Sequence, residues 1–269
     1  MKNFLIFATV FIGRVAALDV QPWFGEVYQF YFLSSYSYSW FHSVQNAKPP
    51  YNKFFYENLL YFDLDFTLAP SWSVDADLQF ADTTAVSPSF RSAALQGRYL
   101  WFDDIVGDPV SFATGISARG TSSYALSDVS CPSHGNLDIE LNLSLGKEFV
   151  SGCSWRYRLW AYGAVGQANR GSPWVNAILA AEMNHRDTHK WALYACGTSA
   201  YGRETHINVE HFFGYAKIRE RLIDLGVRYG YRMGVWGTFR FDYLYRVLAK
   251  SAPENVNSVA VSWLIPFGL

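Results

Sequence analysis

The chain has 269 residues, enough for one large domain, and 50% of them are hydrophobic, 18% aromatic and only 17% charged. A formal net charge of -1 excludes a global field that would attract nucleic acid, and the sequence has no basic tract or nucleic-acid motif. The 18 Tyr, 21 Phe and 10 Trp, set among so few charges, are typical of a protein with aromatic belts at two membrane interfaces.

The N-terminal sequence is typical of a secretory signal. Lys2 supplies a basic start, an apolar run follows, and the small residues Ala16 and Ala17 end the pattern. We expect cleavage after Ala17, which divides the chain into a signal peptide, 1–17, and a single domain, 18–269. A membrane anchor is the less favoured alternative, because the apolar run is shorter than the roughly 20 residues of a spanning helix.

Beyond the signal, apolar and polar residues alternate in runs of about ten residues that are separated by turn residues. One run places Leu60, Phe62 and Leu64 on one face, and Asp63 and Asp65 on the other. The alternation predicts about twelve antiparallel strands. They lie near residues 25–40, 56–69, 72–82, 91–102, 110–119, 136–149, 153–167, 173–184, 189–201, 218–232, 236–248 and 257–269.

The stretch HINVEHFF, residues 206–213, also alternates. As a strand it would give an odd total, whereas single-chain bacterial barrels have even strand numbers. We therefore predict that it belongs to a loop, and that short connections alternate with longer ones along the chain.

The chain ends in SVAVSWLIPFGL, in which bulky apolar residues alternate with small ones. Val259, Val261, Trp263, Ile265 and Phe267 fall on one face of the predicted last strand. A terminal strand of this kind resembles the last strand of bacterial outer-membrane β-barrel proteins, which usually ends in Phe or Trp. Here two further residues follow the last aromatic side chain.

The signal, the strand rhythm and the terminal strand together resemble bacterial outer-membrane β-barrel proteins of the porin-like superfamily. The resemblance implies an all-β fold, a transmembrane antiparallel β-barrel with short periplasmic turns and longer outer loops. It also implies an outer-membrane location, contact with the lipid of that membrane, and recognition by the barrel assembly machinery. A soluble β-sandwich is the alternative, but its exposed apolar band would aggregate.

Charged residues on the predicted inner face are unevenly distributed. The acidic patch on the second and third strands comprises Asp63, Asp65, Asp75 and Asp77. The basic ladder on the tenth and eleventh strands comprises Arg228, Arg232, Arg240 and Arg246. Because charged rings set pore selectivity, we predict a porin-like channel for passive, charge-biased passage of small hydrophilic solutes, with no cofactor and no metal.

A closed or very narrow barrel is the structural alternative to a channel, since eight-stranded barrels are filled by side chains. In such a barrel the inner charges would simply pair. Asp138 and Glu140 lie on the strand next to Arg156 and Arg158, and are the expected example.

The loop sequence RETHINVEHFFGY carries a further polar cluster. If it were helical, His206 and Glu210 would share a face, yet the spacing is not that of a zinc-protease motif. We predict that the protein is not an enzyme and that Arg203, His206, Glu210 and His211 lie in a loop that narrows the pore. A loop-based hydrolase, which would also use Glu204, is the less favoured alternative.

Three cysteines, Cys131, Cys153 and Cys196, leave at least one thiol unpaired within the chain. Their wide spacing gives no metal pattern, and the simplest interpretation is one internal pair or none. The alternative is a surface-exposed structural or adhesion barrel, in which Cys131 forms a disulfide with another chain.

Overall fold

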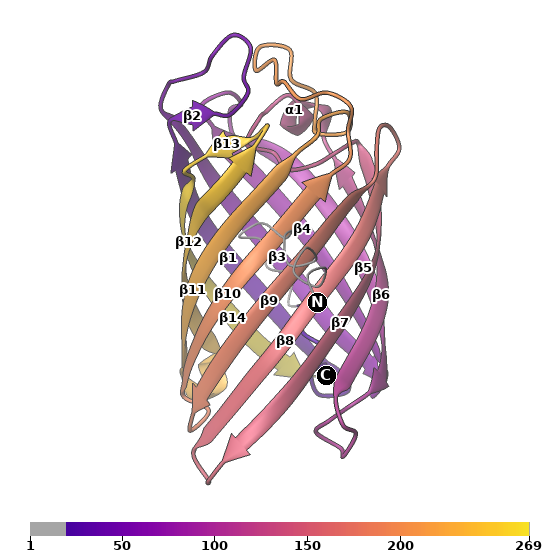
Figure 1. Cartoon of the computed structure of the whole chain (residues 1–269). Helices are drawn as coiled ribbons and strands as arrows, with labels where there is room; N and C mark the ends of the chain where they lie inside the picture. The colour runs from indigo at the N-terminus through magenta and orange to yellow at the C-terminus, as the bar shows by residue number, and fades with distance from the viewer. Residues whose placement is uncertain (1–19, 269) are drawn as a thin grey trace, which may run out of the picture.

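The computed structural model describes residues 20–268, so the predicted signal peptide 1–17 and Leu269 lie outside the described residues. Twelve strands form one closed antiparallel barrel (Figure 1). They are β1 (Gln29–Phe41), β3 (Phe55–Ala69), β4 (Trp72–Thr83), β5 (Ser89–Phe102), β6 (Ser111–Thr121), β7 (Leu137–Ser151), β8 (Trp155–Ala168), β9 (Trp174–His185), β10 (His189–Ala200), β11 (Arg221–Arg232), β12 (Thr238–Lys250) and β14 (Asn257–Gly268). No helix in the described part of the chain is long and apolar enough to span a membrane.

The predicted twelve-strand antiparallel barrel is confirmed, with boundaries that differ by a few residues. The segment 206–213 is a loop, as predicted, in which Ile207 forms only an isolated bridge with Ala47. Four short elements add to the barrel: β2 (Ser43–Val44), β13 (Pro253–Glu254), α1 (Ser123–Leu126) and the 3-10 helix η1 (Gly234–Trp236). Elements of two to four residues have no measurable period, so the sequence pattern does not reveal them.

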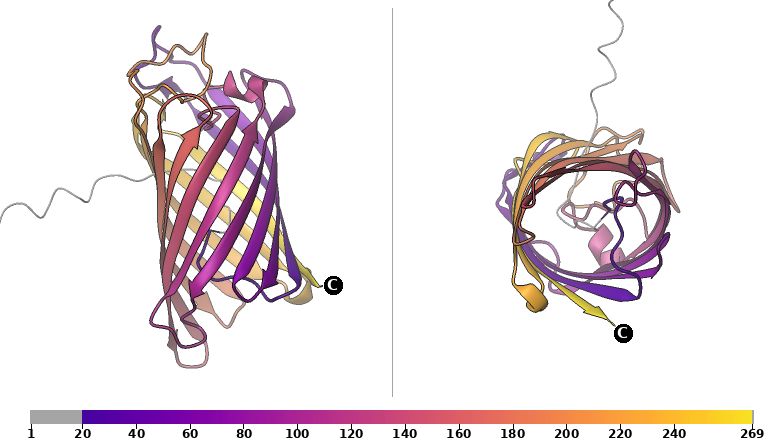
Figure 2. Two further views of the ribbon diagram at one scale, coloured as in Figure 1. Left: turned by 90° about the vertical axis from the view of Figure 1, so that its right-hand side faces the viewer. Right: turned by 90° about the horizontal axis from the view of Figure 1, so that it is seen from below.

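Two strands from opposite ends of the chain close the barrel. β1 pairs with β3 on one side and with β14 on the other, where Gln29 lies opposite Gly268 and Trp40 opposite Asn257. Seen from below, the strands form a complete ring (Figure 2). Each strand therefore has a hydrogen-bonded neighbour on both sides, which satisfies backbone groups within the sheet as a lipid environment requires.

The two ends of the barrel differ in their connections. The turn end, at the bottom of Figure 1, carries five short connections: 70–71, 103–110, 152–154, 186–188 and 233–237. The loop end, at the top, carries six that are mostly longer: 42–54, 84–88, 122–136, 169–173, 201–220 and 251–256. This alternation is the one predicted from the sequence.

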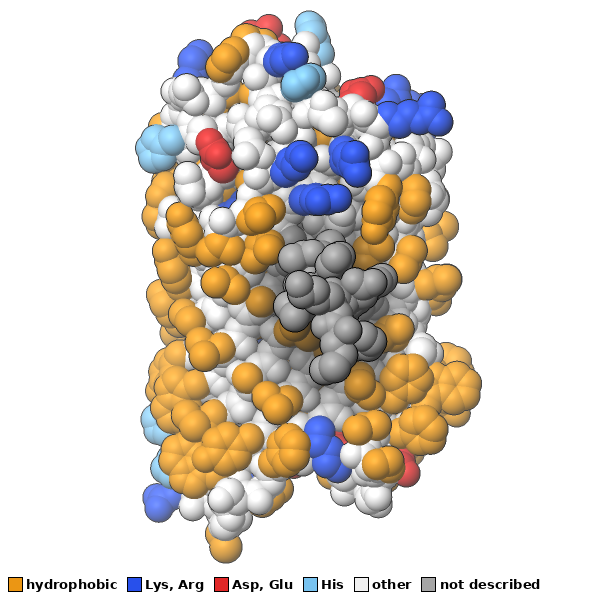
Figure 3. All heavy atoms as spheres, in the orientation of Figure 1, with side chains coloured by type: hydrophobic (Ala, Val, Ile, Leu, Met, Phe, Trp, Pro, Cys, Tyr) orange, Lys and Arg blue, Asp and Glu red, His pale blue; other side chains and the backbone are white. Residues whose placement is uncertain are grey.

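The outer wall is apolar and the inner wall is polar, the inverse of a soluble protein. On β7, the outward residues Leu137, Ile139, Leu141, Leu143 and Leu145 are 44% to 64% exposed. Figure 3 shows hydrophobic side chains spread over the wall between the two ends. An apolar band of this extent would aggregate in water, so the wall is suited to lipid.

The last strand follows the same rule. Val261, Trp263 and Phe267 are exposed on the outer wall, whereas Ser258 and Ser262 are buried on the inner wall. The outward face predicted for the end of the chain is therefore confirmed in the described residues.

Aromatic side chains on the outer wall form a girdle near the turn end. Trp72 and Trp101 both pack against Tyr99, with ring centroids 5.0 and 4.8 Å away, and Trp191 lies 5.8 Å from Tyr229. Amphipathic rings of this kind prefer the membrane–water interface, so the girdle fixes the depth of the barrel in a bilayer.

At the loop end, connections from distant parts of the sequence pack into one hydrophobic cap. Its buried members include Phe41, Phe55, Val129, Ile207 and Tyr215. The cap joins the loops 42–54, 122–136 and 201–220 into one packed unit at the loop end.

We expect Leu141→Arg to lower the free energy of unfolding in phospholipid bilayers by about 2–4 kcal/mol, because Leu141 lies in the middle of the apolar run of β7. Leu137→Arg, at the loop end of the same strand, should cost only about 0–1 kcal/mol because its guanidinium reaches the interface. Urea titrations of both variants measure the difference. Equal costs would contradict the placement of this wall in lipid.

Candidate functional site: the barrel lumen

The inner wall on β4, β5 and β6 is a network of acid–arginine pairs. Arg98 Nε lies 3.2 Å from Asp75 Oδ2, and Arg119 reaches past β5 to donate from Nη1 to Asp77 Oδ1 over 2.9 Å. Both aspartates and Arg98 are buried. The pairs offset the large cost of removing these charges from water, so this wall carries little uncompensated charge.

The wall formed by β11 and β12 has the same design. Arg228 Nε lies 2.7 Å from Asp242 Oδ1, which belongs to the residue directly opposite in the register. Arg246 donates to both carboxylate oxygens of Asp224, over 2.7 and 3.0 Å. The bidentate geometry fixes both side chains against the wall.

All eight residues of the predicted acidic patch and basic ladder lie on the strands expected for them. Asp75, Asp77, Arg228 and Arg246 form ion pairs with oppositely charged residues of nearby strands. The structure therefore places an arginine or an aspartate beside each of these four charges, which reduces the separation of charge inferred from the sequence.

The other four residues of the acidic patch and basic ladder, Asp63, Asp65, Arg232 and Arg240, lie toward the turn end. Asp63 and Asp65 on β3 and Arg240 on β12 line one cavity, together with Arg228. Arg232 lies at the end of β11, in a hollow at the turn end that also holds Arg156 and Lys190.

The prediction that Asp138 and Glu140 on β7 pair with the arginines of β8 is wrong. The hairpin register places Glu148, not Glu140, opposite Arg158, and the Arg158 Nε lies 2.7 Å from Glu148 Oε2. Asp138 lies opposite Ala168 instead. Strand adjacency alone does not identify partners, because a hairpin pairs residues at equal distances from its turn.

A segment that the sequence analysis missed occupies the lumen. Residues 20–28, the plug segment, precede β1 and fold into the barrel from the turn end. The first strand was predicted to begin at residue 25, but it begins at Gln29. The run Pro22-Trp23-Phe24-Gly25 breaks the alternation, and this break is the only signal of the segment in the sequence.

Two arginines of the wall hold the plug segment by its aromatic rings. The guanidinium carbon of Arg98 lies 4.9 Å from the ring centre of Phe24, and that of Arg158 lies 4.5 Å from the ring of Trp23. Arg98 Nη1 also donates to the carbonyl oxygen of Gln21 over 2.8 Å. Cation–π contacts in desolvated surroundings contribute up to about 2 kcal/mol each, so Arg98 couples the acidic wall to the plug segment.

Further contacts fix the first half of the plug segment. Val20 is buried against Tyr162 and Ala164. Gln21 Nε2 donates to Glu182 Oε1 over 2.9 Å, and Trp23 Nε1 donates to an oxygen of Asp104 over 2.7 Å.

Asp104 anchors the plug segment from the turn between β5 and β6. Burial acts to raise the pKa of this carboxyl, but hydrogen bonds from Ser111, the Glu148 backbone N–H and Trp23 outweigh burial and hold the pKa below its ordinary value of 3.8. A lowered pKa means that the ionised carboxylate is stabilised by folding. This stabilisation is present above pH 3.8 and is lost as the pH falls through the lowered pKa.

Two cavities of similar volume lie on either side of the plug segment. The upper chamber, about 230 Å³, lies under the cap, and Val20 forms part of its floor. The lower chamber, about 240 Å³, opens toward the turn end and is lined by Trp23 and Phe24 together with charged residues of β3 and β10–β12. The lumen is therefore interrupted by the plug segment and not filled throughout.

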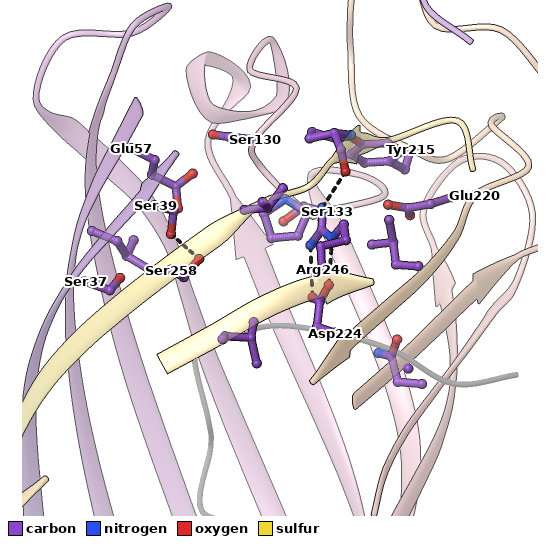
Figure 4. A pocket seen from close by; sticks show the side chains of 18 of the residues that line it. Ser37, Ser39, Glu57, Ser130, Ser133, Tyr215, Glu220, Asp224, Arg246 and Ser258 are labelled. Atoms are coloured by element: carbon purple, nitrogen blue, oxygen red, sulfur yellow. Dashed lines mark hydrogen bonds and ion pairs between the residues drawn. The ribbon is translucent and has the colours of Figure 1, made fainter. Parts of the chain in front are cut away.

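The upper chamber is lined by hydroxyl and charged groups (Figure 4). Ser39 Oγ and Ser258 Oγ lie 2.7 Å apart across the β1–β14 seam. Above them, Tyr215 donates from its hydroxyl to the carbonyl oxygen of Val129 over 2.7 Å, which joins two loops of the cap. Apolar residues, among them Phe41 and Leu244, line much of the rest of the chamber.

The predicted constriction residues lie on the outside of the cap. Arg203, His206, Glu210 and His211 are exposed, as is Glu204, and the segment is not helical. The apolar residues of the same loop, including Ile207 and Tyr215, point inward and are buried in the cap.

None of the three cysteines forms a disulfide in the described part of the chain. Cys131 is only 1% exposed and its Sγ lies 3.7 Å from Ser133 Oγ, so the predicted inter-chain disulfide through Cys131 would require the loop to open. Cys153, in the turn between β7 and β8, is the exposed one. Within residues 20–268, no group of three or more His, Cys, Asp and Glu side chains is placed to hold a metal ion.

No protein-family model and no curated protein matches the chain. Among solved structures, it is similar to an outer membrane channel from Pseudomonas putida F1, with a TM-score of 0.62 and 11% identity over 94% of this chain and 100% of that chain. It is also similar to the NanC porin, with a TM-score of 0.54 and 10% identity over 88% of this chain and 100% of that chain.

A third similar structure is the beta domain of the Bordetella autotransporter BrkA, with a TM-score of 0.50 and 12% identity over 90% of this chain and 100% of that chain. Identities this low establish the fold alone, which is that of outer-membrane β-barrel proteins. The resemblance inferred from the strand rhythm and the terminal strand is confirmed at this level.

We expect Asp104→Asn to loosen the plug segment, because the neutral amide is a weaker partner for Trp23 and Glu148. Chymotrypsin should then cleave after Trp23 and Phe24 several-fold faster than in the wild type, as measured by sequencing the barrel fragments. The matched control is Asp103→Asn, because Asp103 bonds Ile105 and Ser111 in the same turn but does not contact the plug segment. Equal cleavage of both variants would contradict the role of Asp104 as an anchor.

Proposed function

We propose that the protein is an outer-membrane channel for the passive passage of small hydrophilic solutes, with the loop end facing outward. The observation that carries the proposal is the polar lumen, in which two chambers are separated by the nine residues 20–28. The two cavities along the axis support a channel over a closed barrel, in which the inner charges would also pair. The orientation rests on the rule that short turns face the periplasm and longer loops face outward.

Two barriers stand in the path of a solute. The cap closes the loop end, and the plug segment closes the middle of the barrel through non-covalent contacts. We infer that conduction requires both to move aside. The two barriers act in series, so relief of one alone leaves the other to limit the flow.

The charge bias of the channel is also part of the proposal. Asp63 and Asp65 on one wall of the lower chamber, and Arg228 and Arg240 on another, support a site that sorts solutes by charge. The remaining four predicted residues would act through the ion pairs and the hollow described above. Charged side chains of this kind set field and selectivity and do not perform chemistry.

Replacing Trp23, Phe24 and Tyr215 with alanine together should raise single-channel conductance in planar bilayers several-fold above the wild type. The three changes remove both ring contacts of the plug segment and the hydroxyl that joins the cap. Replacement of Val106, Tyr124 and Tyr201, which are 79%, 75% and 54% exposed and lie outside the plug segment, is the matched control and should leave conductance unchanged. A folded, heat-modifiable triple variant that remained silent would reject the channel and favour a surface structural barrel.

In the same open background, Arg228→Gln with Arg240→Gln should shift the reversal potential in a salt gradient toward cation selectivity. The change removes two positive charges from the lower chamber, including the arginine that forms the ion pair with Asp242. The control is Lys48→Gln with Lys53→Gln, which makes the same change in net charge on exposed residues of the loop 42–54. Unchanged reversal potentials in the lumen variant would remove these arginines from the selectivity site.

A further inference from the structure

A group of cations on the outer wall at the loop end takes no part in the lumen. Lys217, Arg219 and Arg221 are exposed at alternate positions, while the intervening Ile218 and Glu220 are buried. Alternation of this kind places Arg219 and Arg221 on one face of an extended chain, and Lys217 lies just before them at the end of a turn. The chain remains extended before β11, since the backbone N–H of Ala200 donates to the carbonyl oxygen of Glu220 over 3.0 Å.

Lys250 completes the group, which we call the basic rim: Lys217, Arg219, Arg221 and Lys250. Arg221 and Lys250 lie directly opposite each other in the register of β11 and β12. Like charges in directly opposed positions destabilise a sheet. In the part of the chain that the structure describes, no ion pair joins any of the four to a carboxylate. The exposed acid nearby is Glu204, whose backbone carbonyl oxygen accepts a hydrogen bond from the backbone N–H of Arg219. The four cations and this one carboxylate leave a net excess of three positive charges.

The position of the basic rim indicates its partner. The next outward pair below Arg221 and Lys250 is Ile223 with Leu248, which belongs to the apolar wall. The cations therefore lie at the border between the lipid-facing wall and the loops. Figure 3 shows Lys and Arg side chains gathered at this level, directly above the hydrophobic band. In a bilayer, this border is the depth of the lipid headgroups.

We propose that the basic rim binds the phosphate groups of an anionic lipid headgroup in the outer leaflet. Arginine offers phosphate a planar pair of donors, and each cation near an anionic membrane surface contributes to binding. A bound phosphate would also relieve the repulsion between Arg221 and Lys250. The inference rests on the proposed function only for its orientation, which places the loop end in the outer leaflet.

Native mass spectrometry of the full chain, folded in a neutral detergent and titrated with diphosphoryl lipid A, tests the proposal. We expect Arg221→Gln with Lys250→Gln to weaken lipid binding on the order of ten-fold or more, from the loss of two cations at the headgroup level. The matched control is Lys48→Gln with Lys53→Gln, exposed at the loop end in a different loop, which should bind as the wild type does. If the first variant fails to fold, Lys217→Gln with Arg219→Gln repeats the test outside the regular strand.

Three outcomes would overturn the proposal. In the first, the Arg221 and Lys250 variant binds the lipid as tightly as the wild type does. In the second, that variant and the Lys48 and Lys53 control lose binding equally. In the third, the same residues bind inorganic pyrophosphate as tightly as they bind the lipid. The last outcome would assign the rim to a free anion. Because these side chains point away from the lumen, the rim variant should conduct as its background does. If the variant with Trp23, Phe24 and Tyr215 replaced by alanine stayed silent but still bound the lipid, the channel would be rejected and this site retained.

Discussion

The pairing of β1 with β14 is the constraint on which the rest of the structure depends. In lipid, an unpaired strand edge would expose a row of N–H and C=O groups at a cost of several kcal/mol each. Joining the first strand to the last removes both edges. The closed ring then encloses a lumen in which charged side chains can be retained. It also places the start of β1 and the end of β14 at the turn end, where the plug segment joins β1.

Inside this ring, the distribution of charge follows from the cost of burying charged side chains away from water. A buried carboxylate is stable only beside a cation or several hydrogen-bond donors, and the barrel supplies arginines one or two strands away. Arg98 serves two purposes, because it compensates Asp75 and also holds Phe24 and the Gln21 carbonyl. The wall and the plug segment are thus parts of one electrostatic unit.

The sequence predicted the barrel well because lipid outside and water inside impose a period of two on every strand. The run from Leu137 to Leu145 and the terminal strand show this pattern most clearly. The loop 206–213 was assigned correctly only by counting strands. The plug segment has no period of its own, and its contacts with Asp104 and Arg158 join residues 81 or more positions apart. The pairing of Arg158 with Glu148 depends on hairpin register, which strand positions alone do not specify.

The covalent link between the plug segment and β1 has a consequence for how the lumen would open and close. Residue 28 is joined directly to the first strand, and the Tyr28 backbone N–H donates to Thr67 on the neighbouring strand over 2.9 Å. A tethered blocker has an effective concentration in the millimolar range at its site, whatever the abundance of the protein. In the proposed channel, closure would therefore be a unimolecular event that dilution does not weaken. A soluble competitor for the same surface would have to be present at millimolar levels, or bind far more tightly, to hold the barrel open.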